Sequence, residues 1–227
     1  MTANEFYNEF NLVYNNLASN QAPGLDKYEI SVYLTKAQNT LVDALYREYE
    51  KSEEARRKLV TLVVTKKLTS VNDSSYQSLY PEYTKVFEGL DDVRYIVEEQ
   101  VKMSKKADRC IRDSYLRIRP ILHDELDVIV NNPYKFNIRR ALRLDSSKDD
   151  VAYIEILSKD KDNIEYYQIR YIKNPKPILL DVFDELIDGE QLTTTPSFDE
   201  NICQLPEIVH RQIVEIAAKL AYQDYKS

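Results

Sequence analysis

Residues Tyr166 to Leu180 read Tyr-Tyr-Gln-Ile-Arg-Tyr-Ile-Lys-Asn-Pro-Lys-Pro-Ile-Leu-Leu, and this stretch decides how the chain is organised. Its first half alternates, with Tyr167, Ile169 and Tyr171 on one side of an extended backbone and mainly polar residues on the other. This is the period of a half-buried strand. The sequence therefore predicts a strand here, with a tyrosine-rich apolar face.

A second apolar run precedes this strand in the chain. Val151 to Leu157 is rich in apolar residues, and the polar turn Lys159 to Asn163 separates it from Glu165 to Ile172. Two such runs joined by a short polar turn are typical of a β-hairpin. We therefore expect the opening stretch to be the second strand of a hairpin that begins at Val151.

The strand is expected to end in a stiff, extended exit. Pro175 and Pro177 each lack a backbone N–H and force the residue before them into extended geometry. The exit carries Ile178 and Leu179 at its tip. These side chains either pack on a helical layer or a neighbouring subunit, or return to the core of their own chain.

Both ends of the chain show the period of amphipathic helices. Thr2 and Glu5 form a capping-box pattern, Asp26 is the expected N-cap of a long second helix, and Pro206 with Glu207 opens a final helix. The apolar stripes are Phe6, Phe10, Val13, Tyr14 and Leu17; Ile30, Leu34, Ala37, Leu41 and Leu45; and Val209, Ile213, Ile216, Ala217 and Leu220.

Short alternating runs between these helices predict strands. Val93 to Val97 alternates, and so does Leu116 to Ile121, where Pro120 marks a strand end or an edge. Val60 to Leu68 fits either a strand or the tail of the second helix. The predicted fold class is α+β, with long terminal α-helices forming a helical bundle and an inserted antiparallel β-rich region. The expected domains are residues 1–70 plus 205–227 for the bundle and 71–204 for the insertion.

Composition excludes several classes of protein. The chain has 227 residues, a net charge of -7 and three isolated glycines, so it carries neither a Walker loop nor a dinucleotide-binding fingerprint. It has no apolar run long enough for a membrane span and no signal-peptide pattern. Two cysteines indicate a reducing compartment, that is, a protein made in a cytoplasm. Eighteen tyrosines without tryptophan favour protein contacts.

Candidate catalytic groups lack supporting motifs. Cys110 with His123, and Cys203 with His210, are the available thiol–imidazole pairs, but no third orienting group accompanies either, and their spacing matches no zinc site. Carboxylate pairs are expected by chance in a chain this acidic; they are Asp91 with Asp92, Asp149 with Asp150, and Asp184 with Asp188. We expect no enzyme activity, no catalytic residue, no cofactor and no metal site.

A basic segment runs from Lys102 to Arg143, with eleven lysines and arginines against five acids. It is either a solvated strand face or a surface for an acidic partner. The residues that a nucleic-acid-binding accessory protein would use are Arg112, Arg117, Arg119, Arg139, Arg140 and Arg143. The tyrosines Tyr166, Tyr167 and Tyr171 have the chemistry to stack on bases, although the net charge favours a protein contact or a core for them.

Four blocks of sequence carry a resemblance to a known family. They are Thr2 to Phe6, Tyr28 to Gln38, Tyr167 to Ile178 and Leu205 to Val214, and together they sample most of the chain. These blocks resemble virion structural proteins of crAss-like, Bacteroidales-infecting tailed phages. Within that group the chain is similar to the ring or adaptor proteins that sit below the portal and connect head to tail.

This resemblance implies a structural role. It implies a virion subunit that assembles as a homo-oligomeric ring, with twelve copies to follow the portal, joins the portal to the tail and lines the DNA channel. The implied partners are the portal protein, other connector or tail proteins, and DNA that passes without specific recognition. Another neck or tail component, or a nucleic-acid-binding accessory protein, is the alternative.

Overall fold

The computed structural model describes residues 1–18, 23–71, 76, 78–88, 90, 92–104, 115–136, 140–148, 151–181 and 202–226. The chain forms two compact units, one made of Met1–Leu62 with Asn174–Ser227 and the other of Val63–Lys173. Residues 63–70 and 174–181 thus fall in the opposite unit from the one expected from the sequence. The fold is mixed, with helices at both ends of the chain and the strands grouped between them.

The first unit is helical. It contains α1 (Ala3–Ala18), α2 (Lys27–Arg47), α3 (Glu53–Leu59), a single 3₁₀ turn, η1 (Val60–Leu62), and, after the second unit, η4 (Glu207–Val209) and α5 (His210–Lys226). Both predicted caps are confirmed. The Thr2 N–H donates to Glu5 Oε2 at 2.8 Å, and the Glu29 N–H donates to Asp26 Oδ1 at 2.7 Å.

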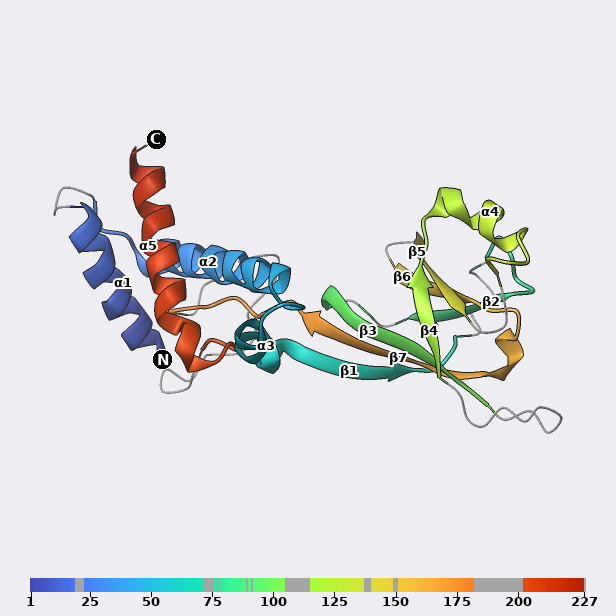
Figure 1. Cartoon of the computed structure of the whole chain (residues 1–227). Coiled ribbons are helices and arrows are strands. Elements are labelled where there is room, and N and C mark those ends of the chain that lie inside the picture. The colour runs from blue at the N-terminus through green and yellow to red at the C-terminus, as the bar shows by residue number, and fades with distance from the viewer. Residues whose placement is uncertain are drawn as a thin grey trace. The chain divides into compact units, whose positions relative to one another are not determined.

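Helix α5 packs against both α1 and α2 (Figure 1). Its buried face is rotated from the predicted stripe, because Ile216 and Leu220 are only half-buried while Ala217, Ala218 and Ala221 are buried. Small side chains let two helices approach a third closely, so packing selects the alanine face over the bulkier one. Val209 and Ile213 are buried as predicted.

The charged region after α2 is a separate element. Helix α2 ends at Arg47, and the Ser52 Oγ accepts a hydrogen bond from the Ala55 N–H at 3.3 Å to cap α3. The ambiguous run from Val60 to Leu68 divides into η1 and the strand β1 (Val63–Leu68). The strand alternative is therefore the correct one for most of this run.

The second unit is built on a seven-stranded sheet in the order β1-β7-β3-β4-β5-β6-β2. After β1, its strands are β2 (Thr84–Glu88), β3 (Val93–Met103), β4 (Tyr115–Pro120), β5 (Ala141–Lys148), β6 (Val151–Leu157) and β7 (Ile164–Lys173). The pairs are antiparallel except β4 with β5, which are parallel over three residues. The predicted antiparallel region thus contains one parallel junction.

The predicted hairpin of Val151–Leu157 with Glu165–Ile172 is wrong in its pairing, although both strands exist. Strand β6 pairs with β5 and β2, whereas β7 pairs with β1 and β3, so neither strand has an edge left for the other. The actual hairpin joins β5 to β6, where Lys148 pairs with Val151 across a two-residue connection. Two-residue connections are the commonest in antiparallel hairpins.

Two apolar clusters lie on opposite faces of this sheet. One contains the predicted face of β7, with Tyr167, Ile169 and Tyr171 all fully buried. The other lies under the short helix α4 (Leu126–Val130), which follows the 3₁₀ turn η2 (His123–Glu125) and was not predicted. Strand β5 contributes to both clusters, since Ala141 faces the first and Leu142 the second.

The extended exit from β7 lies along helix α2 in the first unit. Three polar residues of α2 are buried at i, i+4 and i+7, namely Ser31, Thr35 and Gln38. Ser31 Oγ accepts from the Leu180 N–H at 3.0 Å, and Thr35 Oγ1 accepts from the Ile178 N–H at 3.1 Å. Gln38 Nε2 donates to the Lys176 carbonyl at 2.8 Å. One stripe of a helix therefore supplies the hydrogen bonds that a neighbouring strand would otherwise supply.

The exit delivers its apolar tip to the chain's own core. Ile178, Leu179 and Leu180 are buried, with exposed fractions of 0%, 6% and 2%. Of the outcomes expected for Ile178 and Leu179, the structure shows burial in their own helical unit and not exposure toward a neighbouring subunit. This burial depends on the polar stripe, because the backbone between the apolar side chains enters the core with them.

We predict that the Thr35→Val variant unfolds at a lower urea concentration than the parent protein. Valine has nearly the same shape but leaves the buried Ile178 N–H without an acceptor, which costs about 1–3 kcal/mol. Thr40→Val is the matched control, because Thr40 is exposed and bonds only within its own helix, to the Lys36 carbonyl. Equal midpoints for the two variants would contradict this account of the exit.

Candidate interaction surfaces

The thiol–imidazole pair Cys203 and His210 is buried and already bonded to other groups. The Cys203 thiol donates to Gln38 Oε1 at 3.3 Å, and burial raises its pKa to about 11. His210 Nε2 lies 2.9 Å from the Leu205 carbonyl, its Nδ1 lies 3.0 Å from the Met1 nitrogen, and burial lowers its pKa. A protonated thiol and a ring with both nitrogens bonded serve packing and not nucleophilic attack.

Of the other candidate pair, only His123 lies among the described residues. His123 is exposed in η2, where its Nε2 lies 3.0 Å from the Asp145 carbonyl, and Cys110 falls outside the described residues. Of the carboxylate pairs, only Asp92 is described. It accepts from the Tyr171 hydroxyl at 2.8 Å and pairs with Lys66 at 3.2 Å. Within the described ranges, no cluster of three or more potential metal ligands occurs.

The three tyrosines proposed for base stacking have different environments. Tyr167 and Tyr171 are fully buried, and the Tyr167 hydroxyl donates to Glu99 Oε2 at 3.0 Å. Burial, with the Glu99 carboxylate, raises the pKa of Tyr167 far above its usual range. Only Tyr166 lies on the outer side of the strand, where its hydroxyl is 3.0 Å from that of Tyr115. The buried pair therefore belongs to the core.

The basic residues also separate by position. Arg143 is internal, since its side chain is 11% exposed and pairs with Glu99 Oε2 at 2.8 Å and Asp145 Oδ1 at 3.1 Å. Arg117, Arg119 and Arg140 are exposed. Arg112 and Arg139 lie outside the described residues. The proposed arginine set is thus not a single surface, and its last member is a core ion pair.

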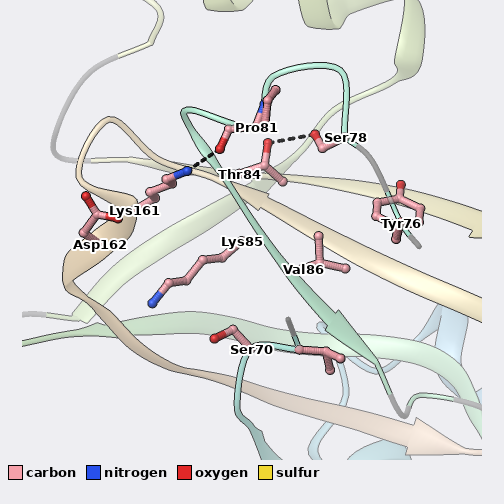
Figure 2. Close-up of a pocket in the computed structure, with 10 residues that line it drawn as sticks. Ser70, Tyr76, Ser78, Pro81, Thr84, Lys85, Val86, Lys161 and Asp162 are labelled. Atoms are coloured by element: carbon pink, nitrogen blue, oxygen red, sulfur yellow. Dashed lines mark hydrogen bonds between the residues drawn. The ribbon is translucent and has the colours of Figure 1, made fainter. Parts of the chain in front are cut away.

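A polar pocket lies where β2 meets the segment before it (Figure 2). Tyr76, Ser78, Thr84, Lys85 and Lys161 are among its lining residues. The ammonium of Lys85 donates to the Ile164 carbonyl at 2.6 Å, that of Lys161 donates to the Pro81 carbonyl, and Ser78 Oγ lies 3.0 Å from Thr84 Oγ1.

The buried carboxylate of Glu155, next to this pocket, holds the segment before β2 in place through hydrogen bonds. Glu155 of β6 is 5% exposed and accepts from the Tyr76 hydroxyl, from Ser78 Oγ at 2.5 Å and from Ser146 Oγ at 3.3 Å. Burial and the Glu155 carboxylate raise the pKa of Tyr76 to about 12. Because these hydroxyls and lysines are bonded to the protein itself, the pocket anchors the segment before β2 and presents no activated nucleophile.

Exposed apolar side chains gather around α4. Leu122 and Val128 are 67% and 61% exposed, and Tyr134, in the turn after α4, is 90% exposed. Leu79 is 77% exposed, and the neighbouring Tyr80 hydroxyl donates to Asp127 of α4 at 2.6 Å, which ties the two segments together. We call Leu79, Leu122, Val128 and Tyr134 the α4 surface. Apolar side chains that form one contiguous exposed patch mark protein contacts, so we treat the α4 surface as a candidate contact.

No helix among the described residues is long and apolar enough to cross a lipid bilayer.

The sequence matches the family model described as "Phage tail ring protein 3/4" over residues 1–227. It is 32% identical to "Ring protein 3" of Bacteroides phage crAss001, with 97% of this chain and 95% of that protein aligned. It is 27% identical to "Ring protein 4/5" of the same phage, with 100% and 94% aligned.

We predict that Cys203 is inert toward a thiol reagent in the folded protein. In a Cys110→Ser background, Ellman's reagent should modify Cys203 only as fast as the protein opens, because the buried thiol has a pKa of about 11 and remains protonated. The rate of Cys203 modification is measured at increasing urea concentrations. A rapid reaction without denaturant would show a reactive thiol and reopen the catalytic interpretation.

We also predict opposite outcomes for two arginines of the basic segment. Arg143→Met should destabilise the protein by about 2–4 kcal/mol, because it leaves Glu99 buried without its cation. Arg117→Met should change the unfolding free energy by less than about 0.5 kcal/mol, because Arg117 is exposed. Chemical denaturation of the two variants tests this, and similar stabilities would show that Arg143 is not part of the core.

Proposed function

This chain belongs to the phage tail ring protein 3/4 family, and from that membership we propose that it is a structural subunit of the head-to-tail connector. It is a virion ring protein of the crAss-like phages, a component of the tail or neck. In the proposed assembly, copies form a ring, of twelve subunits to follow the portal. The ring joins the portal to the tail and surrounds the DNA channel.

The observation that carries this proposal is the extent of the match. The family model matches the whole chain, and the two crAss001 relatives align over at least 94% of their own lengths. Both relatives are named as ring proteins. A likeness that includes both the helical unit and the β unit supports a shared role for the whole subunit and not for one module.

We propose distinct roles for the two units. The terminal helices act as a helical bundle that α5 organises, since α5 contacts both α1 and α2. The β unit is the inserted domain, bounded at Val63 and Lys173. The buried cores of both units support independent packing of each, as expected of a subunit whose surfaces must keep their shape in a ring.

The α4 surface is our candidate for the contact with the next copy. A ring requires a head-to-tail interface, in which two different surfaces of the same chain meet. Leu122, Val128 and Tyr134 provide exposed apolar area on a short helix and its flanking turns, and Asp127 is held by Tyr80 beside them. Apolar side chains within a polar rim are the usual composition of a stable contact.

The test is native mass spectrometry of the purified protein, alone and with the portal protein. We expect an oligomer in at least one of the two samples, and expect Val128→Asp to reduce it while the thermal unfolding midpoint is retained. Leu12→Asp is the matched control, because Leu12 is equally exposed, at 64%, but lies in the helical unit. Monomers under both conditions would exclude the ring.

The same experiment separates the connector from the alternative location. A ring that forms without the portal and never binds it would favour another neck or tail component. A ring that forms on the portal, or binds to it, supports the position between head and tail. Neither outcome requires an enzymatic step.

A further inference from the structure

The β unit has one open sheet face that is cationic. Paired residues on adjacent strands point to the same side of a sheet, so the register assigns the members of this face. Lys67 of β1 pairs with Gln168 of β7. Lys102 of β3 pairs with Tyr166 of β7 on one side and with Tyr115 of β4 on the other. We call this set the cationic face: Thr65 and Lys67 of β1; Tyr166, Gln168 and Arg170 of β7; Glu98, Gln100 and Lys102 of β3; and Tyr115, Arg117 and Arg119 of β4.

The opposite side of the same strands is the apolar core. Tyr167, Ile169 and Val101 alternate with members of the cationic face and are fully buried. The core therefore fixes the orientation of the open face, because a strand cannot turn one side chain outward without turning its neighbour inward. The positions of the exposed cations are thus set by packing.

The charge on this face is strongly positive, although the whole chain carries -7. The face holds five lysines and arginines and a single acid, Glu98, which pairs with Arg170 at 3.3 Å. Within the described ranges, no carboxylate pairs with Lys67, Arg117 or Arg119. The unneutralised cations attract a polyanion.

Two of the lysines are positioned by tyrosine rings. The Lys102 ammonium lies 4.8 Å from the centroid of Tyr115, and the Lys67 ammonium lies 5.1 Å from that of Tyr166. The two hydroxyls lie 3.0 Å apart and join the rings across the sheet. Cations held this way lose less conformational entropy when an anion binds. Because ammonium groups lie over the rings, the tyrosines hold cations and do not stack on bases.

We propose that the cationic face contacts the phosphate backbone of duplex DNA without reading its sequence. Phosphate contacts use lysine, arginine, tyrosine hydroxyls and amide side chains, which are the groups found here. A packed protein interface needs apolar anchors and is depleted in lysine, whereas the residues of the cationic face are polar or charged; the next pair on this side, Val63 and Ile172, is half-buried and buried. The source of the DNA, the tail channel, rests on the proposed function; the binding chemistry does not.

The dimensions of the face limit how many phosphates it can contact. Four adjacent strands span roughly 14 Å at the usual strand spacing, and phosphates follow one another every 3.4 Å along a DNA strand, by rise. The face therefore covers about three or four phosphates. Contacts of this number are weak and salt-sensitive, which allows DNA to slide past a ring of such faces.

The test is fluorescence anisotropy of a labelled, mixed-sequence duplex with the full chain, over a series of salt concentrations. We expect binding at low salt with a logarithmic slope of about -3, from roughly 0.9 per phosphate. Lys67→Glu combined with Arg117→Glu should weaken binding at least about tenfold and reduce the slope by about 2. The milder Lys67→Gln with Arg117→Gln should lie between the two.

The matched control is Lys135→Glu with Lys219→Glu, which makes the same change of charge at exposed residues outside the cationic face. This control should bind DNA like the parent protein. Absent binding at low salt, or equal losses in both double variants, would overturn the proposal. So would a loss of oligomers in the face variant with DNA binding unchanged, since it would assign the face to a protein contact.

The readouts also separate this inference from the proposed function. Native mass spectrometry of the same samples reports assembly, and anisotropy reports DNA binding. Oligomers that do not bind DNA would exclude the DNA contact and still support the ring. DNA binding by a chain that never assembles would exclude the ring and still support the DNA contact.

Discussion

The buried polar stripe of α2 is the constraint on which the helical unit depends. The chain leaves the sheet at Lys173 as an extended segment with no partner strand, and its backbone N–H and C=O groups must still be satisfied when Ile178 and Leu180 enter the core. Ser31, Thr35 and Gln38 meet this requirement from one side of a helix. Gln38 also accepts a hydrogen bond from the Cys203 thiol, so the same stripe contacts the segment that leads into η4 and α5.

In the β unit, the equivalent constraint is the occupancy of strand edges. Strand β4 is short, and it pairs with β3 through Tyr115 to Arg117 and with β5 through Ile118 to Pro120. It therefore joins a three-stranded part, β1-β7-β3, to a second part, β5-β6-β2. Helix α4 covers an apolar cluster on one face of the second part, and the cationic face lies open on the first.

Arginine residues on neighbouring strands of this sheet have opposite roles. Arg143 and Arg117 are both strand arginines of one basic segment, but Arg143 lies beside Glu99 inside the sheet and Arg117 lies outside. Strand register decides which one a partner can reach. For that reason the cationic face includes Lys67 and Arg170, which lie far along the chain from the basic segment.

The sequence by itself determined the local structure: the helix caps at Thr2 and Asp26, the stripe of α2, most of the stripe of α1 except the half-buried Val13 and Leu17, the alternation of β7 and its proline exit, together with the phage ring family. These depend on residues close together in the chain. Only the tertiary structure decided which strands pair, which face of α5 is buried, and whether Ile178 faces a core or a neighbour. Those choices depend on competition between distant segments for edges and volume, as when β5 takes the edge of β6 that β7 was expected to occupy. The polar stripe of α2 was missed because buried serine and threonine have a recognisable helical spacing but no signal that identifies their partner.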